Sequence, residues 1–100
     1  MSTEGATTTS DFGSALAGLM REQGVSYRML ASRTSLSAGY LNHLVHGNRP
    51  VPANPVIERI ALALGVPPER FREYRLRVVT DRLAELPELV DRLYREIQEG

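Results

Sequence analysis

The chain has 100 residues and a mass of 11.1 kDa, which limits it to one compact domain with a short appendage and excludes a multidomain enzyme. With 42% apolar and 24% charged residues it can bury a hydrophobic core, and its twelve basic and twelve acidic side chains cancel to zero formal charge. The absence of cysteine excludes disulfides, thiolate metal sites and thiol nucleophiles. No apolar run approaches the roughly 20 residues of a membrane helix, and the start has no apolar signal segment, so we expect a cytoplasmic protein.

The first elements of the chain are a polar lead-in and a helix. Residues 1–10 are rich in serine and threonine and have no helical periodicity, so they are predicted to be disordered. From Asp11 to Gly24, apolar residues recur at helical spacing, which predicts the first helix. Ser10 or Asp11 can cap its N-terminus, and Gly24 can end it in a left-handed conformation.

Two short helices are predicted next, separated by three or four residues. Ser26 can cap a helix of about two turns, with Met29 and Leu30 on its inner face. Ser37 can cap the following helix, and Gly47 stands where a left-handed residue closes it. The apolar side of this helix carries Tyr40, Leu41, Leu44 and Val45.

Prolines mark the boundaries of the later helices. Two of them keep residues 48–53 out of a helix, and Asn54 followed by Pro55 predicts an N-cap with proline at the first helical position. The helix that starts there is expected to reach about Leu64 and to end at Gly65. A further proline pair opens a fifth helix, which is expected to bury Phe71.

The C-terminal quarter carries an apolar repeat with alternating spacings of three and four residues, as in the a and d positions of a heptad. Because an interior proline costs about 3 kcal/mol, the fifth helix should end near Leu86 and a sixth should begin at Pro87. So wide an apolar stripe needs a partner, and we predict that residues 76–100 form a homodimerisation segment. Packing against the rest of the chain and binding to a different protein are the alternatives. The predicted dimerisation residues are Leu76, Val79, Leu83, Leu86, Val90, Leu93 and Ile97.

The segment from Gly24 to Pro50 resembles the phage-repressor-like (XRE-type) helix-turn-helix family of DNA-binding domains. The matching marks are Gly24-Val25-Ser26, Leu30-Ala31, Leu36-Ser37, Leu41, Leu44, Gly47, Arg49, Ile60-Ala61 and Leu64-Gly65-Val66. The resemblance covers Phe12 to about Tyr74. It implies an all-α fold, with a five-helix repressor-like domain over residues 11–75 followed by the C-terminal helical dimerisation segment. The family commonly has glycine where this chain has Ser35, which costs stability if that residue is left-handed.

The resemblance also implies how the domain meets double-stranded DNA. The helix capped by Ser37 would lie in the major groove, and the preceding helix would cross it near the phosphates. The positions that would read bases are Ser37, Ala38, Gly39, Asn42 and His43. The positions that would touch the DNA backbone are Tyr27, Arg28, Tyr40, Asn48 and Arg49. In agreement with an anionic partner, the stretch from Arg21 to Pro50 carries four arginines against one glutamate.

Ala38 and Gly39 offer no hydrogen bonds to base edges, and we hypothesise that their small size lets the helix approach the groove wall closely. His43 and His46 lack a third ligand for a metal, and their protonation would make DNA binding sensitive to pH. The carboxylates lie among arginines as on a solvated helix face, so no catalytic site, cofactor or metal is predicted.

Together these patterns predict a sequence-specific transcriptional regulator of the repressor type, acting as a homodimer on an inverted-repeat operator. Such a protein would be nucleoid-associated within the cytoplasm. Two alternatives stay open. One is a nucleoid-type architectural protein that binds DNA with little sequence discrimination. The other is an antitoxin-like or adaptor-like module whose C-terminal helix binds a second protein.

Overall fold

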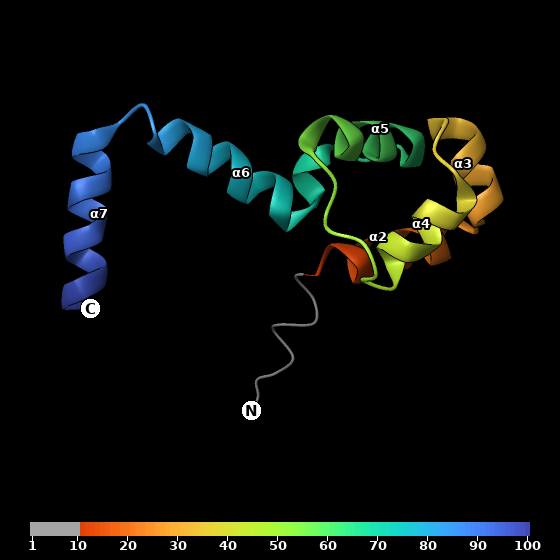
Figure 1. Ribbon diagram of the computed structural model, residues 1–100, viewed down its shortest axis with the longest axis horizontal. Helices are drawn as coiled ribbons and strands as arrows, with labels where there is room; N and C mark the ends of the chain where they lie inside the picture. Colours follow the sequence, from red (N-terminus) through yellow and green to blue (C-terminus); the bar gives the residue numbers. More distant parts are fainter. Residues whose placement is uncertain (1–10) are drawn as a thin grey trace.

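The computed structural model describes residues 11–100, so the predicted disorder of residues 1–10 lies outside the described residues. All regular elements of the described part are helices, without strands, and this confirms the predicted all-α fold. Four helices, α2 to α5, form a compact bundle, from which α6 leads away before α7 turns sharply at the C-terminal end (Figure 1). The elements are α2 (Phe12–Gln23), α3 (Tyr27–Thr34), α4 (Ala38–Val45), α5 (Asn54–Leu64), the 3₁₀ turn η1 (Pro68–Arg70), α6 (Arg72–Leu83) and α7 (Pro87–Glu99).

Short-range interactions set most helix ends, as the sequence predicts. The side chains of Asp11, Ser26 and Ser37 each accept a hydrogen bond from a backbone N–H in the first turn of the helix that follows, at 3.0–3.1 Å. Gly24 and Gly65 end α2 and α5 with φ values of 66° and 69°, a region that glycine enters without steric cost. The predicted caps at these positions are therefore confirmed.

The predicted N-cap at Asn54 is wrong. Asn54 is the first residue of α5, and the cap position belongs to Ala53, whose side chain cannot accept a hydrogen bond. The Asn54 side-chain oxygen accepts instead from Nη1 of Arg77, at 3.1 Å. The side-chain oxygen that the local pattern assigned to the N-cap is therefore used in a long-range hydrogen bond.

The core joins the two ends of the bundle. The rings of Phe12, in the first turn of α2, and Phe71, between η1 and α6, lie 4.8 Å apart with a 43° interplanar angle. Met29 is 41% exposed, so its predicted place on the inner face is wrong; the buried residues of α3 are Leu30 and Thr34. The largest fully buried side chains are Phe12, Leu16, Leu30, Leu41, Ile57, Ile60 and Phe71.

Helices α2 and α4 approach each other unusually closely at Gly13. A β-carbon at this position would lie 2.6 Å from the carbonyl oxygen of Val45 and 2.7 Å from that of Leu44. Both atoms belong to the backbone of the last turn of α4, so no side-chain adjustment could relieve the clash. The absence of a side chain at Gly13 therefore sets the depth at which α4 sits on the bundle.

Long polar side chains satisfy carbonyl groups that the helix C-termini leave without partners. Arg59 of α5 donates to the carbonyl of Thr34 at the end of α3. In return, Arg33 of α3 donates to the Ala63 carbonyl at 3.2 Å, near the end of α5. These reciprocal contacts hold α3 and α5 side by side, and so brace the helix on which α4 rests.

The C-terminal part forms an open hook, by which we mean α6, the turn at residues 84–86, and α7. The predicted break at Pro87 is confirmed, although α6 ends at Leu83, three residues earlier than expected. Leu86 is not helical, with φ −130° and ψ 67°, because the proline ring after it disfavours the helical conformation. No residue of α6 or α7 is buried, and no helix within residues 11–100 is long and apolar enough to span a membrane.

Candidate nucleic-acid interface

A tight turn sets the angle between α3 and α4. Ser35 has a φ of 64°, and it is the single non-glycine residue with positive φ between residues 11 and 100. The buried hydroxyl of Thr34 donates to the Leu30 carbonyl at 2.8 Å and accepts from the Leu36 N–H at 3.2 Å. The turn is thus held from both sides. The left-handed conformation considered for Ser35 from the sequence is confirmed, and it carries the steric cost that glycine would avoid.

The exposed face of α4 carries three of the five predicted base-reading residues. Leu41 and Leu44 are buried, and at 100° per residue the opposite face of the helix holds Gly39, Asn42 and His43, all exposed. The predicted readers thus share one surface, from which two polar side chains project.

The other two predicted base-reading residues lie at the N-terminus of α4. The Ser37 hydroxyl accepts from the Tyr40 N–H at 3.0 Å as the N-cap, which leaves its own O–H free to donate. Ala38 is half-buried.

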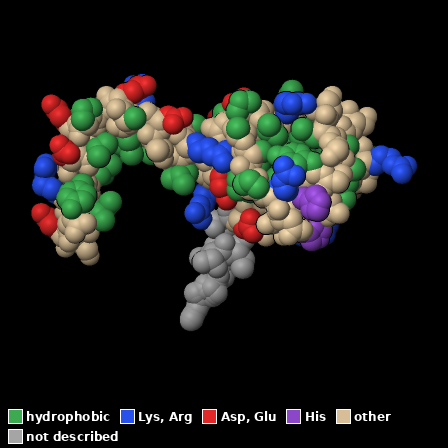
Figure 2. Space-filling view, viewed as in Figure 1, with side chains coloured by type: hydrophobic (Ala, Val, Ile, Leu, Met, Phe, Trp, Pro, Cys, Tyr) green, Lys and Arg blue, Asp and Glu red, His purple; other side chains and the backbone are tan. Residues whose placement is uncertain are grey.

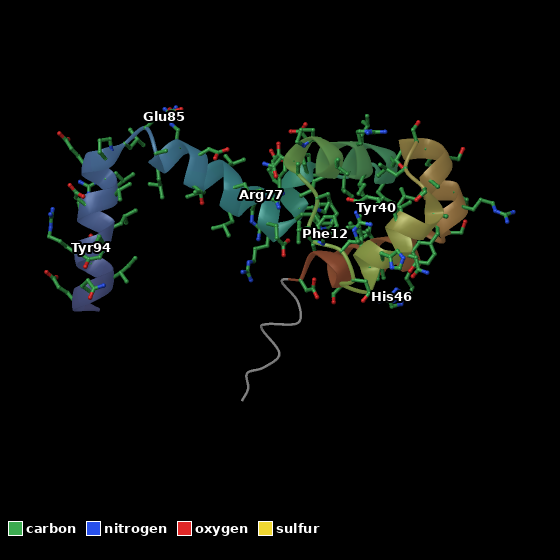
Figure 3. All side chains as sticks on the ribbon, in the orientation of Figure 1. Phe12, Tyr40, His46, Arg77, Glu85 and Tyr94 are labelled. Atoms are coloured by element: carbon green, nitrogen blue, oxygen red, sulfur yellow. The ribbon has the colours of Figure 1, made fainter. Side chains whose placement is uncertain are left out.

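His46, which is not among the predicted base-reading residues, extends this surface. Its ring Nδ1 lies 2.9 Å from the carbonyl oxygen of Asn42, a contact in which the ring must donate. This orients the ring and leaves Nε2 available to a ligand. Both histidines of the chain, purple in Figure 2, gather on one side of the bundle beside an arginine, and Figure 3 labels His46 at this edge. Its spacing from Asn42 and His43 is the signal that could have identified it.

Packing does not explain the glycine within α4. A β-carbon at Gly39 would find no atom within 4 Å, so the fold itself has room for a larger residue. Glycine inside a helix costs up to about 1 kcal/mol relative to alanine. This open space is consistent with our hypothesis that Gly39 is small for the sake of an external surface.

The loop after α4 is held in place on both sides. At its start, the Asn48 N–H donates to the His43 carbonyl at 2.9 Å, and the Arg49 guanidinium lies 5.4 Å from the centre of the Tyr40 ring. At its end, Arg77 of α6 donates to the carbonyls of Val51, at 3.2 Å, and Pro52. Arg77 is a structural contributor to this surface that the sequence analysis missed. Only the fold brings it within reach of a loop 25 residues earlier.

The N-terminus of α3 carries two of the residues that are predicted to touch the DNA backbone. Arg28 is exposed and Tyr27 is half-buried in its first turn. Neither α3 nor α4 has an acidic residue in its first turn, so the positive ends of both helix dipoles are not neutralised. Within residues 11–100 no group of three or more histidine, aspartate or glutamate side chains is placed to hold a metal ion.

A short exposed helix, braced by a second helix across a three-residue turn and edged by arginines, defines a helix-turn-helix DNA-binding protein. Residues 11–74 match the helix-turn-helix domain family, and the chain belongs to this family. It is a DNA-binding protein of the transcription-regulator type.

Its fold is similar to the crystal structure of the clp gene regulator ClgR from Corynebacterium glutamicum, with a TM-score of 0.56 and 27% sequence identity. The similarity covers 81% of this chain and 90% of ClgR, so it reaches beyond residues 11–74. No curated protein matches the chain.

Proposed function

We propose that this protein is a homodimeric, sequence-specific transcriptional repressor whose α4 helices read the two halves of an inverted repeat. The observation that carries the proposal is the exposed face of α4, where Asn42 and His43 project from a helix whose opposite side is anchored in the core. A helix of eight residues that is exposed along one side suits a major groove, which is about 12 Å wide. ClgR, which is similar in fold, is named as a gene regulator, and this supports the same type of role here.

In this proposal the two kinds of contact have separate tasks. Asn42 can donate to and accept from an adenine edge, and His43 can bond to a guanine, so these two side chains determine sequence preference. The predicted backbone contacts fix the register of the domain on the duplex and make binding depend on salt. They are Tyr27, Arg28, Tyr40, Asn48 and Arg49.

The dimer is proposed from the apolar side chains that the hook leaves uncovered. Leu76, Val79 and Ile97 are 55%, 53% and 73% exposed, and an apolar surface of this kind marks an interaction site. Two-fold symmetry would place the two α4 helices about 34 Å apart, one turn of the DNA helix. Such a dimer represses when its operator overlaps a promoter, because occupation of the DNA alone then blocks access.

Selection of bound sequences from a random duplex pool tests this function, followed by a salt titration of the selected duplex against a scrambled one. We expect an inverted repeat whose advantage persists at physiological salt, and an affinity loss of about 1–3 kcal/mol in Asn42→Ala and in His43→Ala. Steep salt dependence without sequence preference would support the architectural alternative instead. Absence of DNA binding would support the interaction module.

Gly39 provides a sharper test of the contact with the groove. Gly39→Ala should raise the free energy of unfolding by up to about 1 kcal/mol, because the site is open and alanine is the better helix former. Gly39→Arg should lower affinity for the selected operator by about tenfold or more, since its side chain would separate α4 from the groove. Gly18→Ala, in α2 and equally open, is the control that should stabilise the fold without changing DNA binding. Full operator affinity in Gly39→Arg would contradict the close approach.

The dimer is tested by the variant that combines Leu86→Glu with Leu93→Glu. Charges in the apolar stripe should convert the wild-type dimer to a monomer in sedimentation velocity, while circular dichroism shows an unchanged bundle. A variant that stays dimeric would reject the proposed dimer interface.

A further inference from the structure

The apolar faces of the hook are open because the corner between α6 and α7 is a structured turn. Three backbone hydrogen bonds, from the N–H groups of Ala84, Glu85 and Leu86, run back into the last turn of α6 at 2.9–3.2 Å. Arg82 and Glu85 add an ion pair of 3.0 Å across the corner. Pro87 then keeps Leu86 out of the helical conformation, with φ −130° and ψ 67°. The turn therefore directs α7 away from α6 rather than back along it, as Figure 1 shows.

Two apolar surfaces face outward as a result. On α6, Leu76 and Val79 form the floor of a shallow hollow of about 270 Å³, and Arg72 and Arg75 form its rim. On α7, apolar side chains gather along the side that faces the space inside the hook (Figure 2). Within residues 11–100, α7 packs mainly against α6, and the two helices touch only near the corner between them. Each helix thus has an apolar stripe that needs a second helix.

The charges of the two helices have opposite signs. Helix α6 carries four arginines against two acidic residues, whereas α7 carries four acidic residues against two arginines. On α7, Asp91 and Glu96 lie beside the apolar stripe, three residues from Tyr94 and Leu93 respectively. An arginine-rimmed apolar floor on one helix therefore complements an acid-rimmed apolar stripe on the other.

The same charges disfavour the simpler pairings of like helices. Two copies of α6 that met at this hollow would bring the Arg72 and Arg75 rims together, and two copies of α7 that met along the stripe would do the same for Asp91 and Glu96. Like charges that face each other across an interface suppress the wrong pairing. The two helices also match in length, with 12 residues in α6 and 13 in α7.

We propose that two copies exchange their C-terminal helices, so that α7 of each copy lies inside the hook of the other, against its α6. The exchange rests on the proposed homodimer and specifies its arrangement. Leu76 and Val79 of one copy pack under the stripe of the other copy's α7, and Asp91 and Glu96 face the rim formed by Arg72 and Arg75. Because the contact is reciprocal, it closes with two-fold symmetry and leaves no free hook for a third copy.

Charge reversal on full-length chains tests the exchange. One variant combines Arg72→Glu with Arg75→Glu, a second combines Asp91→Arg with Glu96→Arg, and a third carries all four changes. In sedimentation equilibrium we expect the dimer dissociation constant to rise about tenfold or more in the first two, and to return to near the wild-type value in the third. Under pairing of like helices, the first two variants would instead keep the wild-type value, since each still faces its own sign.

Two controls distinguish loss of the exchange from misfolding and from a general effect of added charge on α7. Glu88→Arg with Glu99→Arg makes the same change in charge on the opposite face of α7, and should leave the dissociation constant unchanged. Circular dichroism should show equal helix content in all variants. A wild-type dimer that is indifferent to the first two variants overturns the exchange and leaves the homodimer standing. A wild-type monomer overturns both, and operator binding by the same sample shows whether the proposed DNA recognition survives.

Discussion

The close approach of α2 and α4 leads to a prediction about Gly13. In Gly13→Ala the added methyl group would meet the backbone carbonyls of Leu44 and Val45, at 2.7 and 2.6 Å. Since backbone atoms in a helix cannot rotate aside, the two helices must move apart, and overpacking of this kind costs about 1–3 kcal/mol. The better helix propensity of alanine returns up to about 1 kcal/mol. The Gly13 N–H still donates to Asp11, so the N-cap is not affected.

With a typical overpacking cost of about 2 kcal/mol and a return of up to about 1 kcal/mol, the net effect is a loss of about 1–2 kcal/mol in the free energy of unfolding. For a chain of this size each kcal/mol corresponds to about 4–8 °C in the midpoint of thermal unfolding. Urea unfolding followed by circular dichroism measures the free energy, and a thermal scan gives the midpoint. Because α4 must shift, the affinity for the selected operator should fall as well.

Gly18→Ala is the matched control for this prediction. It makes the same substitution in the same helix, but its β-carbon would find no atom within 4 Å. It should therefore stabilise the fold by about 0.5–1 kcal/mol. If Gly13→Ala were as stable as the wild type or more so, the closeness of α2 and α4 would not determine the position of α4, and the reasoning would be refuted.

Three further predictions follow from single contacts. Arg77→Ala should free the loop that carries Arg49 and weaken operator binding. The loss of affinity should be much smaller when Arg49 is already alanine, and a double-mutant cycle in a gel-shift assay measures this coupling. Ser35→Gly should raise the free energy of unfolding in urea by about 0.5–1 kcal/mol, because glycine adopts the left-handed conformation without strain; no gain would contradict this. A hydrogen bond to Glu58, helped by burial and by the carboxylate charge, raises the pKa of the Tyr74 phenol above its ordinary 10.0. Since the folded state then holds the proton more tightly, the contribution of Tyr74 to stability is fully present below pH 10.0 and is lost as the pH rises through the folded-state pKa. This alkaline loss should be absent in Tyr74→Phe, as measured by urea unfolding at pH 9 and pH 11.

The sequence was sufficient to predict that Asn42 and His43 are exposed on α4. Once Leu41 and Leu44 were assigned to the inner side of α4, the helical period alone directed Asn42 and His43 outward. Their roles in base reading stay a prediction, to be tested by the variants above. What the pattern could not supply is the support beneath them, since Gly13 and Arg77 reach this surface from elements distant in the sequence.

The sequence by itself determined where most helices begin and end, because Asp11, Ser26 and Ser37 cap neighbours only two or three residues away. Only the tertiary structure decided how deeply α4 rests on α2 at Gly13, and that Asn54 serves Arg77 rather than its own helix. It likewise decided that the hook stays open. Caps depend on neighbours along the chain, whereas these features depend on which distant surfaces packing brings into contact, and no local pattern contains that information.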